Sequence, residues 1–203
     1  MNKDQIIKEY DDRFKKKPNK WKSDERNEMC YQTIARLTTE PKSIFDVGCG
    51  NGHTLAYLSD KFPNAKFYGL DPSQEALNLA HKNCPKAELH RAFLDDFATN
   101  KKFDVVINLG TAEHFEDLLP NLKLIRSLVS DEGFCYFEAP HNLEYDFGDG
   151  SHSYRRLNYG SHQVEWHLDR SEWEDYLIRA GFSISERISG AKPQWEFIWI
   201  LKA

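Results

Sequence analysis

Two acidic residues and three glycines stand where a predicted buried strand gives way to a helix. In "SIFDVGCGNGHT", Asp46 is followed by Gly48, Gly50 and Gly52, and a second acid, Asp71, ends the next apolar run in "YGLDPS". A glycine loop between a strand and a helix presents bare backbone N–H groups and the positive end of the helix dipole. This arrangement is typical of a nucleotide site.

The spacing of the loop argues against a nicotinamide dinucleotide. That fingerprint has glycine at its first, third and sixth positions, whereas here Gly52 is fifth and His53 is sixth. A carboxylate at Asp46 repels a pyrophosphate and attracts an ammonium or sulfonium cation. Asp71, on the neighbouring strand, is placed to accept both hydroxyls of a ribose. A ligand with a ribose, a carboxylate and a cationic head is S-adenosylmethionine, which these residues predict as the cofactor.

Five of the eight histidines fall between the fourth predicted strand and the last predicted helix: His114, His141, His152, His162 and His167. Histidine titrates near neutrality, so this group can supply a general base. Our hypothesis is that His114, beside Glu113, takes the proton of an acceptor hydroxyl, with His162 as the rival base. The alternative is that Glu113 and His114 only begin the next helix and orient the loop.

Other side chains in the same region bear on the acceptor. Arg155 and Arg156 have the fork-shaped donors that bind a carboxylate or phosphate, so an anionic acceptor is one expectation. The nearby acids and histidines lack a tight H-x-x-x-H or paired-aspartate spacing, so we expect no metal site.

The elements that position these residues alternate along the chain. Short Val-, Ile- and Phe-rich runs predict strands at 43–48, 66–71, 87–92, 103–110 and 133–140. Helices are expected to begin near Gly52, Ser73 and Asp117. This alternation indicates an α/β fold, a doubly wound and mostly parallel sheet covered by helices.

The two ends of the chain add to this core within one predicted domain, residues 1–203. Residues 1–41 are predicted to form a helical cap of two helices broken near Pro18, and residues 42–140 the cofactor-binding core. Residues 141–169 are polar and too long for an ordinary connection, so we expect a lid or substrate loop. Residues 170–203 are predicted to close the domain with a helix and an antiparallel pair of strands.

Composition limits the partners. The chain has 203 residues, 40% hydrophobic and 29% charged, and a net charge of −5, which disfavours a nucleic acid. The one basic stretch, "RFKKKPNKWK" at 13–22, is the local exception. We expect no membrane segment because no apolar run approaches the roughly 20 residues required. Four scattered cysteines and the absence of an apolar leader favour a reduced cytoplasmic location, and the oligomeric state is left open.

The motifs together resemble those of one family. "FDVGCGNG", "GLDPS", "FDVVINLGTAEHFED" and "GFCYFEAP", in this order, resemble the class I, Rossmann-like S-adenosylmethionine-dependent methyltransferases, especially the quinone-biosynthesis and small-molecule branch. The resemblance covers about residues 42–203. It implies a seven-stranded sheet whose last strand is antiparallel.

The resemblance also implies roles for the loop residues. Gly48, Cys49 and Gly50 are expected to pass under the methionine part of the cofactor. Asp46 is expected to hold the amino group directly or through water, and Asp71 to bind the ribose.

Further positions follow from the same resemblance. Pro72 is expected to line the adenine and Leu109 to lie near the methionine end. The family often has a Gly-Asp pair after the third strand, whose acid reads the adenine amino group. Here the run is "RAFLDDF", so that either Phe93 takes this place or Asp95 is the acid after a shift; we expect Leu94 and Asp95.

The function implied is methyl transfer from S-adenosylmethionine to an oxygen or nitrogen atom of a small molecule, leaving S-adenosylhomocysteine. The run "NLGTAEH" lacks the Asn/Asp-Pro-Pro-Tyr pattern of methyltransferases that act on nucleobase amines. Two alternatives stay open: a protein or RNA methyltransferase, and a cofactor-binding module without catalysis.

Overall fold

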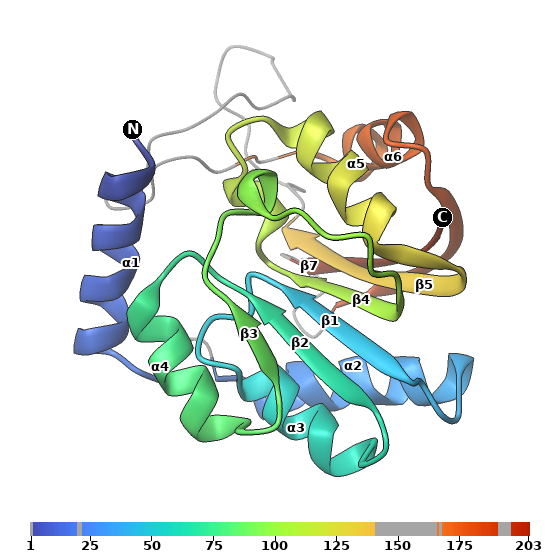
Figure 1. Ribbon diagram of the computed structural model, residues 1–203. Helices are drawn as coiled ribbons and strands as arrows, with labels where there is room; N and C mark the ends of the chain where they lie inside the picture. The colour runs from blue at the N-terminus through green and yellow to red at the C-terminus, as the bar shows by residue number, and fades with distance from the viewer. Residues whose placement is uncertain (1, 20–21, 141–165, 167, 191–195) are drawn as a thin grey trace.

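The computed structural model describes residues 2–19, 22–140, 166, 168–190 and 196–203, and its centre is one seven-stranded sheet (Figure 1). The strands are β1 Ser43–Val47, β2 Lys66–Leu70, β3 Glu88–His90, β4 Phe103–Leu109, β5 Val129–Pro140, β6 Ser183–Ser189 and β7 Glu196–Lys202. Their order is β3-β2-β1-β4-β5-β7-β6. β7 runs antiparallel to both of its neighbours, β5 and β6, and the other strand pairs are parallel. The predicted doubly wound sheet is therefore confirmed, and strand order reverses between β1 and β4.

Helices cover both faces of this sheet. They are α1 Lys3–Lys16, α2 Asp24–Leu37, α3 His53–Lys61, α4 Gln74–Asn83, α5 Leu118–Leu128 and α6 Arg170–Arg179, with short 3-10 turns η1 Leu94–Asp96 and η2 Ala112–His114. Figure 1 shows α2 and α3 below the sheet and α5 and α6 above it. On β1, Phe45 packs into the upper core and Ile44 into the lower one. Both faces of the central strands are buried, which explains their continuous apolar sequences.

The three glycines of the first loop are required by backbone conformation and close packing. Gly48, Gly50 and Gly52 have φ values of 72°, 52° and 73°, a left-handed region that side chains disfavour. A Cβ on Gly48 would collide with the side chain of Thr111, and one on Gly52 would lie 2.8 Å from the Cβ of Ala80. The glycine loop itself therefore packs against α4 and against the turn after β4.

Helix α1 is fastened to the loops at the carboxyl ends of the strands. The Asp11 carboxylate accepts hydrogen bonds from the Ser73 hydroxyl at 2.5 Å and from the Glu75 N–H at 3.1 Å, at the first turn of α4. The Lys3 ammonium group pairs with Asp95 at 2.8 Å. These contacts hold α1 beside α4, across the edge of the sheet where a ligand of this fold is expected.

The main differences from the predicted elements are in length. Strand β3 covers only Glu88–His90, and β5 begins four residues earlier than predicted, at Val129. Nearly all of the predicted lid, residues 141–165 and 167, lies outside the described residues. Within the described part of the chain, no helix has the length and apolarity needed to cross a membrane.

Replacing Gly52 with alanine is expected to destabilise the fold. The new Cβ would lie within 3 Å of Ala80 and at φ 73°, and we expect the free energy of unfolding in urea to fall by about 2–4 kcal/mol. Gly50→Ala is the matched control, because its φ is also positive but its nearest neighbour is the flexible Phe14 ring at 3.3 Å. Equal losses in the two variants would contradict the importance of the contact with Ala80.

Candidate active site

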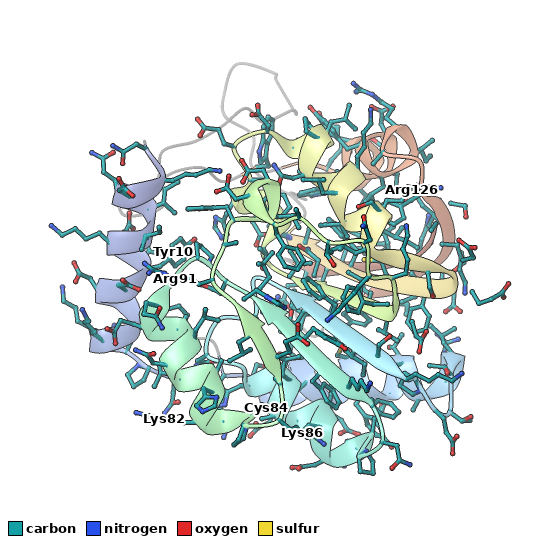
Figure 2. The ribbon with its side chains drawn as sticks, viewed as in Figure 1. Tyr10, Lys82, Cys84, Lys86, Arg91 and Arg126 are labelled. Atoms are coloured by element: carbon teal, nitrogen blue, oxygen red, sulfur yellow. The ribbon has the colours of Figure 1, made fainter. Side chains whose placement is uncertain are left out.

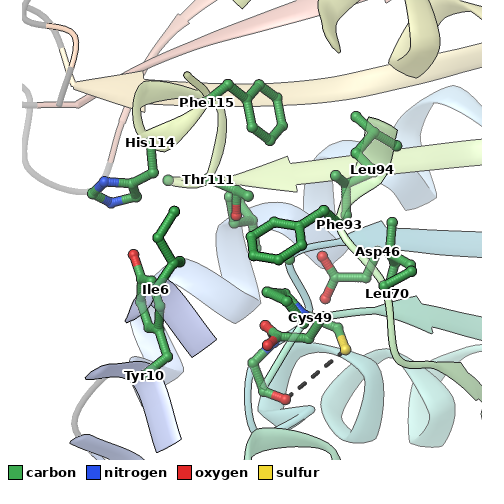
Figure 3. Close-up of a pocket in the computed structure, with 18 of the residues that line it drawn as sticks. Ile6, Tyr10, Asp46, Cys49, Leu70, Phe93, Leu94, Thr111, His114 and Phe115 are labelled. Carbon is green, nitrogen blue, oxygen red and sulfur yellow. Dashed lines mark hydrogen bonds between the residues drawn. The ribbon is translucent and has the colours of Figure 1, made fainter. Parts of the chain in front are cut away.

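One pocket of about 270 Å³ lies between α1 and the carboxyl ends of β1, β2 and β4 (Figure 3). It is lined by ten of the predicted site residues: Asp46, Gly48, Cys49, Gly50, Asp71, Pro72, Leu94, Asp95, Leu109 and His114. Glu113 lies beside it, and His162 is outside the described residues. The fold thus gathers residues from four separate segments into one cavity.

The Asp71 carboxylate is tied to backbone N–H groups on both sides. One oxygen accepts a hydrogen bond from the Gly50 N–H at 3.0 Å, and the other accepts one from the Ser73 N–H at 2.9 Å. Burial raises the pKa of Asp71 to about 6, and these two hydrogen bonds oppose the rise. Asp71 therefore fixes the glycine loop against the start of α4 while facing the pocket.

Asp46 has a different environment, although it lies only one strand away. It sits on β1 between Gly69 of β2 and Ile107 of β4 and is 3% exposed. Among the described residues, no hydrogen bond reaches its carboxyl group. Burial raises the pKa of Asp46 to about 8; the negative charge of Asp71 adds to the rise and Arg26 opposes it. The pocket thus contains a buried acid that a cationic ligand would stabilise in its charged form.

Arg26, on α2, was not identified from the sequence. Its side chain lines the pocket and forms an ion pair with Glu138 of β5, which is 1% exposed. The space for the guanidinium depends on Gly110, whose φ is 60° and whose Cβ would lie 2.8 Å from Nη2 of Arg26. Arg26 and Glu138 are 112 positions apart, so no local spacing could have revealed the pair.

His114 and Glu113 occupy the η2 turn after β4. The Nε2 atom of His114 lies 3.9 Å from the Oε1 atom of Glu113, whose residue is 6% exposed. The Trp166 N–H donates to the Glu113 carbonyl at 2.8 Å, and the Trp166 indole N–H donates to the Phe115 carbonyl at 2.7 Å. The chain therefore returns to this turn directly after residues 141–165.

Two aromatic residues of α1 face the site in different ways. Phe14 is 4% exposed and packs against the glycine loop, with its ring 3.3 Å from the position of a Cβ on Gly50. Tyr10 lines the pocket, on the side of α1 that faces the sheet (Figure 2), and its hydroxyl lies on the same side of the cavity as His114 (Figure 3). Phe14 therefore packs onto the core, whereas Tyr10 contributes to the wall of the pocket.

The predicted adenine region is formed by the η1 turn. Leu94 is 6% exposed, and the half-exposed side chain of Asp95 is paired with Lys3 of α1. Lys3 also lies over the Phe93 ring, 5.1 Å from its centroid. Phe93, Leu94 and Asp95 all line the pocket. That one of them contacts the adenine amino group stays a prediction.

Several candidates cannot be placed. His141, His152, Arg155 and Arg156, like His162, fall outside the described residues. Within the described ranges, no group of three or more His, Cys, Asp or Glu side chains is arranged to hold a metal ion.

The fold and the site define a Rossmann-like α/β protein with its pocket at the point where strand order reverses. Residues 21–186 match the methyltransferase domain family, and the chain belongs to that family.

Individual relatives are distant. The trans-aconitate 2-methyltransferase of Acidovorax ebreus (strain TPSY) is 25% identical over 158 residues, 77% of this chain and 56% of that protein. The malonyl-[acyl-carrier protein] O-methyltransferase of Acetivibrio thermocellus is 34% identical over 112 residues, 52% of this chain and 40% of that one. The chain thus spans about half the length of the curated relatives it matches.

A solved structure shares the fold across almost the whole chain. It is the 1,6-didemethyltoxoflavin-N1-methyltransferase of Burkholderia thailandensis, with a TM-score of 0.78 and 13% identity over 98% of this chain and 87% of that one. That enzyme was solved with 1,6-didemethyltoxoflavin and S-adenosylhomocysteine bound.

Asp46→Asn is expected to stabilise the ligand-free protein, increasingly so as the pH rises. The folded protein keeps the Asp46 proton up to about pH 8, whereas the unfolded chain loses it near the ordinary value of 3.8. The free energy of unfolding of the wild type therefore falls as pH rises between these values, whereas that of Asp46→Asn does not change for this reason. Thermal unfolding should show a Tm advantage for the variant that grows from pH 5 to about 5 °C or more at pH 8.5. An advantage that is constant with pH would contradict the buried titration.

Proposed function

We propose that this protein is an S-adenosylmethionine-dependent methyltransferase that acts on an oxygen or nitrogen atom of a small molecule. The observation that carries the proposal is the pair of buried carboxylates at the glycine loop. Asp71 is held by backbone N–H groups, whereas Asp46 faces the cavity without a hydrogen-bond donor among the described residues. This combination suits a ligand with a ribose and a positive charge.

The lining fits each part of the cofactor. Asp71 would accept the ribose hydroxyls, Asp46 would meet the ammonium group, and the loop from Gly48 to Gly50 would pass under the methionine part. Pro72 and the η1 turn would border the adenine. When bound, S-adenosylmethionine supplies an electrophilic methyl group attached to a sulfonium.

The protein's own task is to align the acceptor, exclude water and take up a proton. Methyl transfer is an in-line displacement, so alignment supplies much of the rate. Helix α1 covers the cavity and contributes Ile6 and Tyr10 to its wall. His114, with Glu113 3.9 Å away, would accept the proton of a hydroxyl or protonated amine.

The relatives support a small acceptor without naming one. Their names include methyltransferases of trans-aconitate, of malonyl-[acyl-carrier protein] and of the nitrogen of (S)-tetrahydroprotoberberine. An acidic acceptor remains part of the proposal, because the first two names describe acids and Arg155 and Arg156 follow β5 in the sequence.

The basic stretch at 13–22 gives little support to a nucleic-acid acceptor. Within the described part of this stretch, Arg13 pairs with Glu9, and Lys15 lies 3.6 Å from Glu75. Lys22 lies 3.8 Å from Asp24. Much of its charge is thus balanced within the protein, which weakens the electrostatic attraction that phosphate binding requires.

Asp71→Ala is expected to abolish tight cofactor binding. The substitution releases the Gly50 and Ser73 N–H groups and removes the predicted ribose acceptor, so the Kd for S-adenosylmethionine should rise about 100-fold or more. Calorimetric titration measures this change, and circular dichroism checks that the variant is folded. Asp60→Asn, an exposed acid on α3, is the matched control and should bind normally. No binding by folded wild-type protein would contradict the proposed cofactor.

His114→Ala is expected to separate catalysis from cofactor binding. With an acceptor identified by screening for S-adenosylhomocysteine formation, kcat should fall by about 10²–10⁴-fold while the Kd for S-adenosylmethionine stays unchanged. His81→Ala, outside the active-site pocket on α4, is the control. Full kcat in the His114 variant would show that this residue is not the proton acceptor.

A further inference from the structure

The Asp46 carboxyl group is surrounded by groups that do not balance a negative charge. Within the described part of the chain, the titratable and charged groups coupled to it are Asp71 directly after β2, Arg26 and Cys30 on α2, and Cys49 in the glycine loop. Burial raises the pKa of both thiols, so Cys30 and Cys49 stay neutral near pH 7. Asp71 adds a second negative charge.

Arg26 is the cation that acts on Asp46, but its charge is already engaged. Its guanidinium forms an ion pair with Glu138, and the side chain is wedged over Gly110. Glu113 also lies close, with Oε1 3.2 Å from the position of a Cβ on Gly110. The ion pair with Glu138 therefore engages the guanidinium and leaves less positive potential for Asp46.

We propose that binding of S-adenosylmethionine expels a proton from the Asp46 carboxyl group, so that cofactor affinity near neutrality increases with pH. The inference rests on the proposed function, because the ligand must bring positive charge into the pocket. In this step the O–H bond of the carboxyl group breaks and the proton passes to the solvent. The carboxylate left behind faces the bound cation, and no covalent bond to the ligand forms.

The direction of the pH dependence follows from the free and bound states. The free protein holds the Asp46 proton at pH 7, since burial raises the pKa of this group to about 8. An adjacent ligand cation favours the charged carboxylate, so the bound protein releases the proton at the same pH. Affinity should therefore rise by up to about tenfold per pH unit between pH 6 and 7.5. In this range the α-amino group of the ligand itself remains mostly protonated.

Calorimetric titration with S-adenosylmethionine at pH 7 measures the released proton directly. Repeating the titration in buffers with different ionisation enthalpies gives the number of protons released per binding event, which should be about 0.9 for the wild type. Asp46→Asn should release almost none at pH 7 and lose most of the pH dependence of its Kd, with a small remainder toward pH 6, where Asp71 titrates. Glu132→Gln, an exposed acid on β5, is the matched control and should release as many protons as the wild type.

Glu138→Gln provides a second and independent test. Without Glu138, the charge of Arg26 is free to stabilise the Asp46 carboxylate in the unliganded protein. Proton release at pH 7 should then fall by at least half, with binding retained. This variant keeps the inference testable even if Asp46→Asn binds too weakly to be measured.

The outcomes separate this inference from the proposed function. Tight binding with no proton release by the wild type would overturn the inference and leave the cofactor assignment standing. Unchanged release in Asp46→Asn would also overturn it, because the proton would come from another group. Unchanged release in Glu138→Gln would contradict the argument that the Arg26–Glu138 pair keeps Asp46 protonated in the free protein. If folded wild-type protein does not bind S-adenosylmethionine, both the inference and the proposed function fail.

Discussion

The carboxylate of Asp71 joins the three parts on which the site depends. Asp71 directly follows β2, and its carboxylate accepts a hydrogen bond from Gly50 in the loop after β1 and another from Ser73 at the start of α4. Because a buried carboxylate is costly without donors, both bonds favour one conformation of the glycine loop. Ser73 in turn donates to Asp11, so the same junction fixes α1 over the pocket.

At Asp46, on the neighbouring strand β1, the stability of the free protein and the binding of a ligand have opposite requirements. A buried acid without donors destabilises the free protein, and Asp46 lies beside a second acid and near an arginine engaged by Glu138. Such an arrangement contributes nothing to folding, and it favours a ligand that carries positive charge. The residues that weaken the free protein are thus the same ones that we propose to bind the cationic part of the ligand.

The local sequence predicted the elements that carry the site but did not predict side-chain pairs formed between distant segments. The β1 glycine loop and the cap at Ser73 were readable, because alternating apolar runs and capping residues act over a few positions. The Arg26–Glu138 pair was not, because it depends on a contact between segments 112 positions apart in the chain. Gly110 was the one local signal for Arg26, and by itself it indicates only a turn.

The central claim is that the two carboxylates and the glycine loop hold S-adenosylmethionine. A crystal structure of the protein with S-adenosylhomocysteine tests it most directly, because that product keeps the ribose and the ammonium group. The account predicts both ribose hydroxyls within hydrogen-bond distance of Asp71, and the ammonium group next to Asp46 or one water away. A ligand bound elsewhere, or one whose ribose does not contact Asp71, would contradict the account.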